Sequence, residues 1–377
     1  MKIIVAPDSF KGSLTAIKAA EAIEAGIKAV FSDAIVIKIP IADGGEGTVD
    51  AVVTATGGEI IHKLVVGPIN KTVNAKMAII NGDIAVIEMA EASGIILVPE
   101  DEKNPLITTT FGTGELILEA VSRNCRKIVI GIGGSATNDC GAGMAQALGF
   151  ILLDEDDNEI GFGGEELSKV SKIVNSHLYD RFKHIEIIVA CDVTNPLCGE
   201  KGASFIYGPQ KGATPEMSKL LDANLSHFAE IIKRDLGKDV KDIPGAGAAG
   251  GLGAALIAFL DAKLVPGIEM VLDTVDFDSK VKDADLVITG EGRIDAQSAF
   301  GKVPMGVARA SKKYNVPVIA IGGSIGDGAS ELYSVGVDAI ASIMTHPMTL
   351  EYAMMNSFEL LKNAVERVMR VYAIKHE

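Results

Sequence analysis

Short, mostly apolar segments, each followed by a turn and a helical pattern, lie near both ends of this chain. They lack the alternation of apolar and polar residues that a half-exposed strand shows, so we expect strands buried on both faces, as in a parallel sheet covered by helices. The five segments are KIIVA (2–6), IVIKI (35–39), ADLVITG (284–290), VPVIAIGG (316–323) and DAIASIM (338–344). We therefore predict an α/β fold whose five-stranded parallel sheet has the flavodoxin-like order 2-1-3-4-5.

Helical periodicity is clearest in four segments. Residues 14–31 place Leu14, Ile17, Ala20, Ile27 and Val30 on one stripe, and Ser13 before them is the expected N-cap. Further helices are expected over residues 113–123, 215–236 and 350–373.

The middle of the chain has a different pattern. Residues 59–66, 72–80 and 84–89 are expected to form antiparallel strands, the last two joined at Asn81-Gly82, a strong hairpin signal. A length of 377 residues also exceeds what one core usually supports. We expect a discontinuous flavodoxin-like domain, residues 1–65 plus 270–377, a large inserted mixed α/β domain, residues 66–269, and an active site in the cleft between them.

Composition narrows the class of partner. The net charge of −15 argues against nucleic acid or an anionic membrane, and any anionic ligand must be held by local donors or metal ions. The first residues lack the organisation of a signal peptide, and the apolar tract at 245–260 is too short and too rich in glycine to span a bilayer. The four cysteines have no zinc or redox spacing, so a reducing, cytoplasmic location is expected.

The turn after the first strand carries Asp8, Ser9, Lys11, Gly12 and Ser13. In the predicted order this turn faces the loop after ADLVITG, at the point where such sheets bind ligands. Lys11 and the amides of the following helix suit an anionic group. The alternative is a helix cap flanked by solvated charges.

A glycine-rich loop, GIGGSATNDCGAG, follows another apolar strand. Its N–H groups suit a phosphate, with Gly133, Gly134, Ser135, Thr137, Asn138 and Asp139 as the candidate residues. The loop also fits the loose dinucleotide pattern with Asp154 downstream, but GAGAAG (245–250) fits it equally, so this match is weak. The alternative is tight packing of a helix on a strand.

Further acidic and basic residues stand at the ends of predicted strands. Asp192, with Asn195 nearby, suits proton removal from a hydroxyl or magnesium binding, and an Asx-turn is the alternative. Arg293 suits bidentate binding of a carboxylate. The remaining acids near glycines are Asp43, Glu46, Glu291 and Asp295.

Several common catalytic motifs are missing from the sequence. It contains no Walker A motif and no G-x-S-x-G elbow, and its six histidines show no metal spacing. A bound nucleotide would therefore be held in another way, and a serine hydrolase is disfavoured.

Seven segments, in order along nearly the whole chain, resemble the signatures of the type 1 bacterial glycerate kinases. They are MKIIVAPDSFKGSLTA, IADGGEGTVDA, GIGGSATNDCGAGMAQALG, ACDVTNPLCG, GPQKGA, PGAGAAGGLGAAL and LVITGEGRIDAQSAFGKVP. The resemblance implies phosphorylation of D-glycerate with ATP and Mg²⁺, most often to 2-phosphoglycerate. It also implies that the inserted domain has a restriction-enzyme-like fold.

Roles for the candidate residues follow as hypotheses from the needs of phosphoryl transfer. Lys11 and Arg293 would hold the glycerate carboxylate and the moving phosphoryl group, assisted by Ser9 and Asn195. Asp192 is the preferred base and Asp8 its rival; residues 133–139 would hold the ATP phosphates, and Asp43 or Asp295 the magnesium. Glycerate and ATP are the expected partners, and a homodimer stays open. The alternatives are 3-phosphoglycerate as product, an NAD-dependent hydroxy-acid dehydrogenase, or a non-catalytic binding protein.

Overall fold

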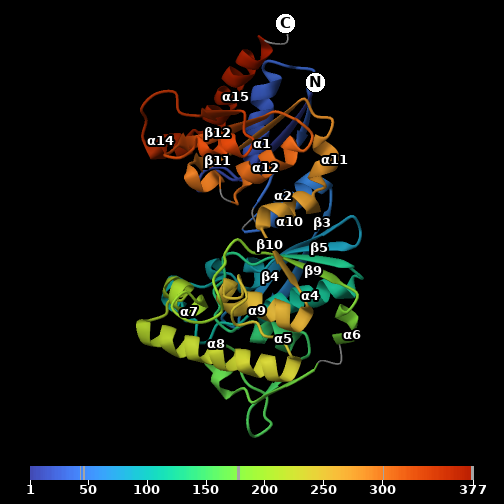
Figure 1. Ribbon diagram of the computed structural model, residues 1–377, viewed down its shortest axis with the longest axis vertical. Helices are drawn as coiled ribbons and strands as arrows, with labels where there is room; N and C mark the ends of the chain where they lie inside the picture. Colours follow the sequence, from blue (N-terminus) through green and yellow to red (C-terminus); the bar gives the residue numbers. More distant parts are fainter. Residues whose placement is uncertain (43, 46, 176–178, 300, 375–377) are drawn as a thin grey trace. The chain divides into compact units, whose positions relative to one another are not determined.

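The structure, a computed structural model, describes residues 1–42, 44–45, 47–175, 179–299 and 301–374, which form two compact units (Figure 1). The first unit comprises Met1–Asp43, Asp50–Gly57 and Ile268–Glu377, and the second comprises Gly44–Val49 and Gly58–Gly267. Residues 58–65, expected in the first domain, lie in the second unit, because β3 (Glu59–Val66) pairs with β4 (Thr72–Ile80).

The first unit contains the predicted five-stranded sheet. Its order is β13-β12-β11-β1-β2 and every neighbouring pair is parallel, which confirms the flavodoxin-like order. Strand β1 is paired on both sides, with Val5 opposite Ile288 in β11 and Lys38 in β2. The strands are β1 (Lys2–Pro7), β2 (Ile35–Lys38), β11 (Leu286–Ile294), β12 (Val318–Ile325) and β13 (Ala339–Ser342).

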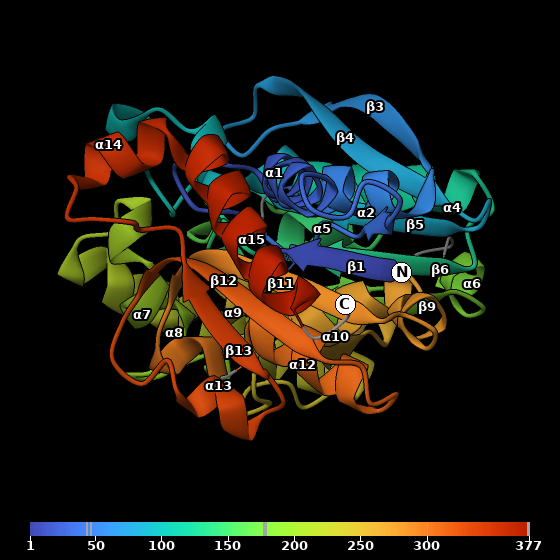
Figure 2. The ribbon, with the colours of Figure 1, turned by 90° about the horizontal axis from the view of Figure 1, so that it is seen from above.

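Two long helices, α1 and α15, cover one face of this sheet (Figure 2). Their apolar residues form one core with the side chains of β1, β11 and β12. A Cβ atom on Gly26 would lie 2.5 Å from the Lys362 carbonyl oxygen, so the two helices approach each other closely. The helices of this unit are α1 (Ala16–Lys28), α11 (Phe277–Val281), α12 (Val303–Lys312), α13 (Glu331–Ser334), α14 (Leu350–Met355), α15 (Ser357–Ala373), and most of α2 (Thr48–Thr56) and α10 (Gly267–Thr274).

Two expectations about helix ends in this unit are wrong. Thr15, not Ser13, caps α1, because a turn in which Phe10 and Leu14 exchange backbone hydrogen bonds of 2.8 and 3.0 Å delays the helix. The Thr15 hydroxyl accepts from Lys18 N at 3.2 Å. The segment expected as one helix over 350–373 is divided at Asn356 into α14 and α15.

The second unit contains a mixed six-stranded sheet of order β10-β9-β6-β5-β4-β3. The pairs β3–β4 and β4–β5 are antiparallel, and the pairs β5–β6, β6–β9 and β9–β10 are parallel. Asn81 and Gly82 both have positive φ in the β4–β5 turn, as the hairpin signal predicts. The other strands are β5 (Ile84–Glu88), β6 (Lys127–Gly131), β9 (Glu186–Ala190), β10 (Lys263–Val265) and a separate antiparallel pair, β7 (Ile151–Leu153) with β8 (Lys172–Val174).

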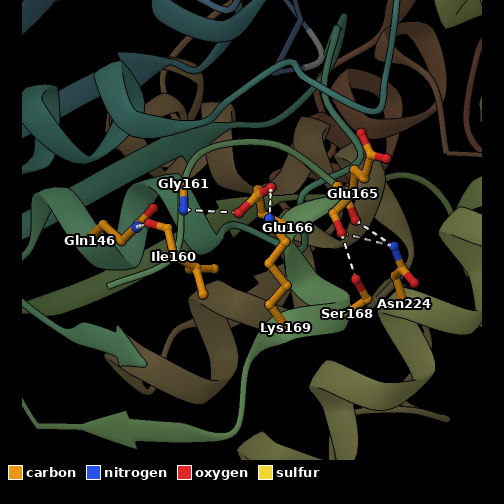
Figure 3. A network of polar contacts seen from close by, with 9 residues as sticks. Gln146, Ile160, Gly161, Glu165, Glu166, Ser168, Lys169 and Asn224 are labelled. Atoms are coloured by element: carbon orange, nitrogen blue, oxygen red, sulfur yellow. Dashed lines mark hydrogen bonds and ion pairs between the residues drawn. The ribbon is translucent and has the colours of Figure 1, made fainter. Parts of the chain in front are cut away.

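The predicted helix over 215–236 is confirmed as α8 (Pro215–Leu236), capped by Thr214 and ended by Gly237. On its buried side, Asn224 donates to the carbonyl oxygens of Gly164 at 2.9 Å and Glu165 at 3.4 Å (Figure 3). The irregular segment before β8 is thereby fixed to α8. The remaining helices of this unit are α3 (Ala90–Ser93), α4 (Phe111–Ser122), α5 (Ala142–Ala147), α6 (Tyr179–Phe182), α7 (Ala203–Tyr207) and α9 (Ala248–Leu260). Within the described ranges, no helix of either unit is long and apolar enough to cross a membrane.

Candidate functional site

In the first unit, candidate residues gather where β1 and β11 end. Because these strands are parallel neighbours, their following loops start side by side, and Asp8 N donates to Gly290 O at 2.8 Å. A Cβ atom on Gly292, near the end of β11, would lie 3.3 Å from Lys11 N, so the end of β11 touches the loop after β1. Asp8 and Ser9 are half-buried, with Asp8 Oδ1 accepting from Ser9 N at 2.6 Å, whereas Lys11 is exposed. The predicted contact between the turn after β1 and the segment after Gly290 is confirmed, but that segment belongs to β11 as far as Ile294 and is not a loop.

Arg293 and Asp295 stand beyond this point on β11 and its loop. Arg293 Nε lies 3.1 Å from Asp295 Oδ2, and the arginine side chain is 68% exposed. An ion pair this exposed contributes little to stability. Asp295 Oδ1 also accepts from Gln297 N at 2.9 Å, which fixes the carboxylate. Arg293 is thus accessible to an anion from solution.

Glu291, for which no individual role was predicted, is the buried acid of this group. Glu291 is only 6% exposed, and its Oε1 has no hydrogen-bond partner among the residues that the structure describes. Burial raises the pKa of Glu291 above its ordinary value, while hydrogen bonding to Ser298 and the charge of Lys302 oppose the shift. An unpartnered carboxylate oxygen in a buried position is costly and is typical of a functional site.

In the second unit, the glycine-rich loop follows β6. Gly133 and Gly134 are exposed, Gly134 has φ of +72°, and Ser135 is 7% exposed. Thr137, Asn138 and Asp139 are fully buried. Of the predicted phosphate-binding residues, mainly Gly133, Gly134 and Ser135 can therefore be reached from solvent. Thr137 Oγ1 and Asn138 Nδ2 have no partner in the described part of the chain.

Asp139 organises the end of this loop. Its Oδ2 accepts from Thr110 N and Thr110 Oγ1, both at 2.8 Å, and from Gly143 N at 3.3 Å, while Oδ1 accepts from Gly141 N at 3.2 Å. Burial raises the pKa of this carboxyl and these hydrogen bonds oppose the shift. Asp139 therefore holds the loop against the start of α4.

Lys211, in the segment GPQKGA, has its charged end inside the protein. It is 2% exposed, and its Nζ lies 2.6 Å from Ser135 Oγ and 2.7 Å from Thr137 O. No sequence pattern distinguishes this lysine from a surface one. Lys211 is therefore absent from the predicted site residues.

Asp192 and Asn195 lie in the loop after β9. Asp192 is exposed and its Oδ1 accepts from Gly267 N, the first residue of α10, at 2.8 Å. Asn195 Nδ2 donates to Lys201 O and its Oδ1 accepts from Tyr207, both at 2.7 Å. Asn195 thus supports the loop, while Asp192 faces solvent.

The magnesium candidates are distributed unevenly. Asp295 follows β11 and pairs with Arg293, whereas Asp43, like Glu46, lies outside the residues that the structure describes. Among the described residues, no group of three or more His, Cys, Asp or Glu side chains is arranged to hold a metal ion. A magnesium ion that is already coordinated by the phosphate oxygens of a nucleotide needs only one or two protein carboxylates. Asp295 and the unpartnered oxygen of Glu291 fit that requirement.

Comparison with known proteins extends these observations over the whole chain. The glycerate kinase family model matches residues 3–373. The chain is 54% identical to a glycerate kinase of Halalkalibacterium halodurans over 368 residues, 97% of each chain. It is 52% identical to the glycerate 2-kinase of Escherichia coli K12 over 375 residues, 99% of this chain and 98% of the relative. A crystal structure assigned as glycerate kinase 2 from Salmonella typhimurium LT2 superposes with a TM-score of 0.91 at 49% identity, covering 100% of this chain and 99% of the other.

Proposed function

The chain belongs to the glycerate kinase family, whose members are phosphotransferases with an alcohol acceptor, and from this we propose that it converts D-glycerate and MgATP into 2-phosphoglycerate and ADP. The observation that carries the choice of product is the near-complete, 52% identical match to a protein named glycerate 2-kinase. Family membership also displaces the dehydrogenase and the non-catalytic binding protein as alternatives.

The reaction forms a bond between the 2-hydroxyl oxygen of glycerate and the γ-phosphorus of ATP, and it breaks the bond from that phosphorus to the bridging oxygen of ADP. Catalysis of such a transfer consists mainly of positioning and of neutralising charge. Exposed Lys11, in the loop after β1, and exposed Arg293, near the end of the neighbouring strand β11, would bind the glycerate carboxylate and the moving phosphoryl group. Ser9 beside them would help to orient the substrate.

The hydroxyl proton needs an acceptor. Asp192 is our preferred base because it is exposed at the end of β9 while Gly267 N holds one of its oxygens in place. Asp8, at the end of β1, is the rival. Asn195 would act only by supporting the loop that carries Asp192.

ATP would be held through the N–H groups of Gly133 and Gly134 and the hydroxyl of Ser135, the accessible part of the glycine-rich loop. Thr137, Asn138 and Asp139 would shape that loop from behind. Magnesium, when bound, neutralises charge on the transferring phosphates, and Asp295, with Asp43 as the other candidate, would hold it directly or through water.

Phosphorus NMR of the purified protein with ATP, Mg²⁺ and D-glycerate tests the proposal. We expect a new phosphomonoester signal that needs all three components and is split by a single proton, as for a phosphate on carbon 2. Splitting by two equivalent protons would instead identify 3-phosphoglycerate. No new signal, with glycerate binding intact, would refute the function.

A further inference from the structure

The ammonium group of Lys211 is buried in the second unit, which costs desolvation free energy. Transfer of an ammonium group from water to a protein interior costs several kcal/mol unless hydrogen bonds compensate. Lys211 is 2% exposed and donates to two oxygens of one loop, Ser135 Oγ at 2.6 Å and Thr137 O at 2.7 Å. Both contacts fall on the segment directly behind the exposed Gly133 and Gly134.

The backbone of that loop is already fixed on its other side. Ile95 N donates to Gly134 O at 2.8 Å, and Ala136 N donates to Ser93 O at 3.0 Å. With the backbone held, the Ser135 hydroxyl hydrogen is the part of the loop that can still change direction, since it rotates to suit its surroundings. An ammonium nitrogen has no lone pair, so it can only donate to Ser135 Oγ.

We propose that Lys211 is a positioning residue of the nucleotide site, which turns the Ser135 O–H outward as a donor to a phosphate oxygen held beside Gly133 and Gly134. The inference rests on the proposed function, because it needs this loop to be the phosphate site. Lys211 does not touch the nucleotide in this scheme. It acts through Ser135.

The arrangement makes nucleotide binding sensitive to pH. Burial lowers the pKa of Lys211 to about 7, and Asp139, the charged group acting on it among the described residues, opposes that shift. Above this pH the neutral amine has one lone pair beside its two N–H donors, so the Ser135 O–H gains an inward acceptor that competes with the phosphate oxygen. The affinity for a phosphate chain should then fall as the pH rises from 6 to 9.

Calorimetric titration with the ATP analogue AMP-PNP and Mg²⁺ at pH 6, 7, 8 and 9 tests this. For the wild type we expect Kd to rise about tenfold across the series, the loss of one hydrogen bond to a charged group. Ser135→Ala and Lys211→Met should both have the weak Kd at every pH. Lys211→Arg, which stays charged, should retain tight binding at pH 9.

Steady-state kinetics gives a second readout. Because Lys211 is proposed to position ATP, its removal should raise the KM for ATP more than it lowers kcat. Matched controls are Lys219→Met, an exposed lysine of α8, and Ser122→Ala, an exposed hydroxyl of α4, both expected to keep the wild-type pH profile. If Lys211→Met does not fold, Ser135→Ala and the wild-type profile decide the matter.

Wild-type Kd and pH dependence in Ser135→Ala would overturn the inference. That outcome leaves the proposed function standing if the NMR assay detects phosphoglycerate. Tight, pH-dependent AMP-PNP binding without phosphoglycerate would instead refute the proposed function and leave the role of Lys211 in nucleotide binding supported.

Discussion

Glu88 shows at the scale of one residue how burial sets a pH dependence. Its carboxylate, 2% exposed, accepts from Val49 N at 2.6 Å and Gly47 N at 3.1 Å, and burial raises its pKa from 4.5 to about 7 although both hydrogen bonds oppose the shift. The folded protein therefore binds more protons than the unfolded chain between these pH values, and the free energy of unfolding falls as the pH rises through them.

We predict that Glu88→Gln removes this dependence. Between pH 4.5 and 7 the wild type should lose roughly 3 kcal/mol of stability through this group, while the variant loses none through it. Urea unfolding at pH 5 and pH 8 measures the difference, and the contributions of other groups cancel when the two proteins are subtracted. Equal pH slopes would contradict the prediction.

Arg293 offers a test of substrate recognition by a single side chain. Arg293→Lys keeps the charge but loses the planar pair of donors that matches a carboxylate. We expect the KM for glycerate to rise about tenfold with the KM for ATP little changed. Lys312→Arg, at an exposed ion pair with Asp338, is the control and should leave both constants unchanged.

The base assignment is also decided at single residues. Asp192→Asn should lower kcat by about a hundredfold, as expected for loss of general-base catalysis, with the KM values nearly unchanged. Asp8→Asn should lower kcat less. The reverse order in steady-state kinetics would transfer the role of base to Asp8.

At the scale of elements, β11 depends on a glycine that lets it approach β12. A Cβ atom on Gly290 would lie 2.2 Å from Ile321 O, inside any permitted contact. We predict that Gly290→Ala lowers the free energy of unfolding by about 3 kcal/mol, measured by chemical denaturation. Gly57→Ala, at φ of +77° with no described atom within 4 Å, should cost only about 1 kcal/mol of backbone strain. Equal losses would show that crowding at β11 is unimportant.

The elements also show what sequence can and cannot predict. Uninterrupted apolar strands indicated the order of the first sheet, Asn81-Gly82 predicted the turn between β4 and β5, and the helical pattern over residues 215–236 predicted α8. The start of α1 was not predictable, because the Phe10–Leu14 turn that displaces its cap depends on contacts across four residues. Burial of Lys211 and Glu291 was equally hidden, since both residue types are normally exposed and their surroundings come from distant segments.

At the scale of the whole molecule, the net negative charge opposes the binding of the proposed anionic substrates. At −15 the protein repels ATP and glycerate, which are both anions, so the local donors must overcome the overall field. The accessible candidates are Lys11 and Arg293 in the first unit and the amides of Gly133 and Gly134 in the second. Under the proposed function, glycerate binds at the cationic side chains of the first unit and the phosphate chain of ATP at the amides of the second.

Hydrogen exchange, followed by mass spectrometry, can test that assignment on the intact protein. A ligand present at a hundred times its Kd stabilises the segment that it binds by about 2.7 kcal/mol, which slows exchange through local opening about a hundredfold. We expect AMP-PNP with Mg²⁺ to protect residues 132–136, and D-glycerate alone to protect residues 9–14. The β7–β8 pair is the internal control and should exchange equally with either ligand. Protection of residues 132–136 by glycerate, with none at 9–14, would reverse the assignment, because the carboxylate would then bind at the amides that we give to ATP.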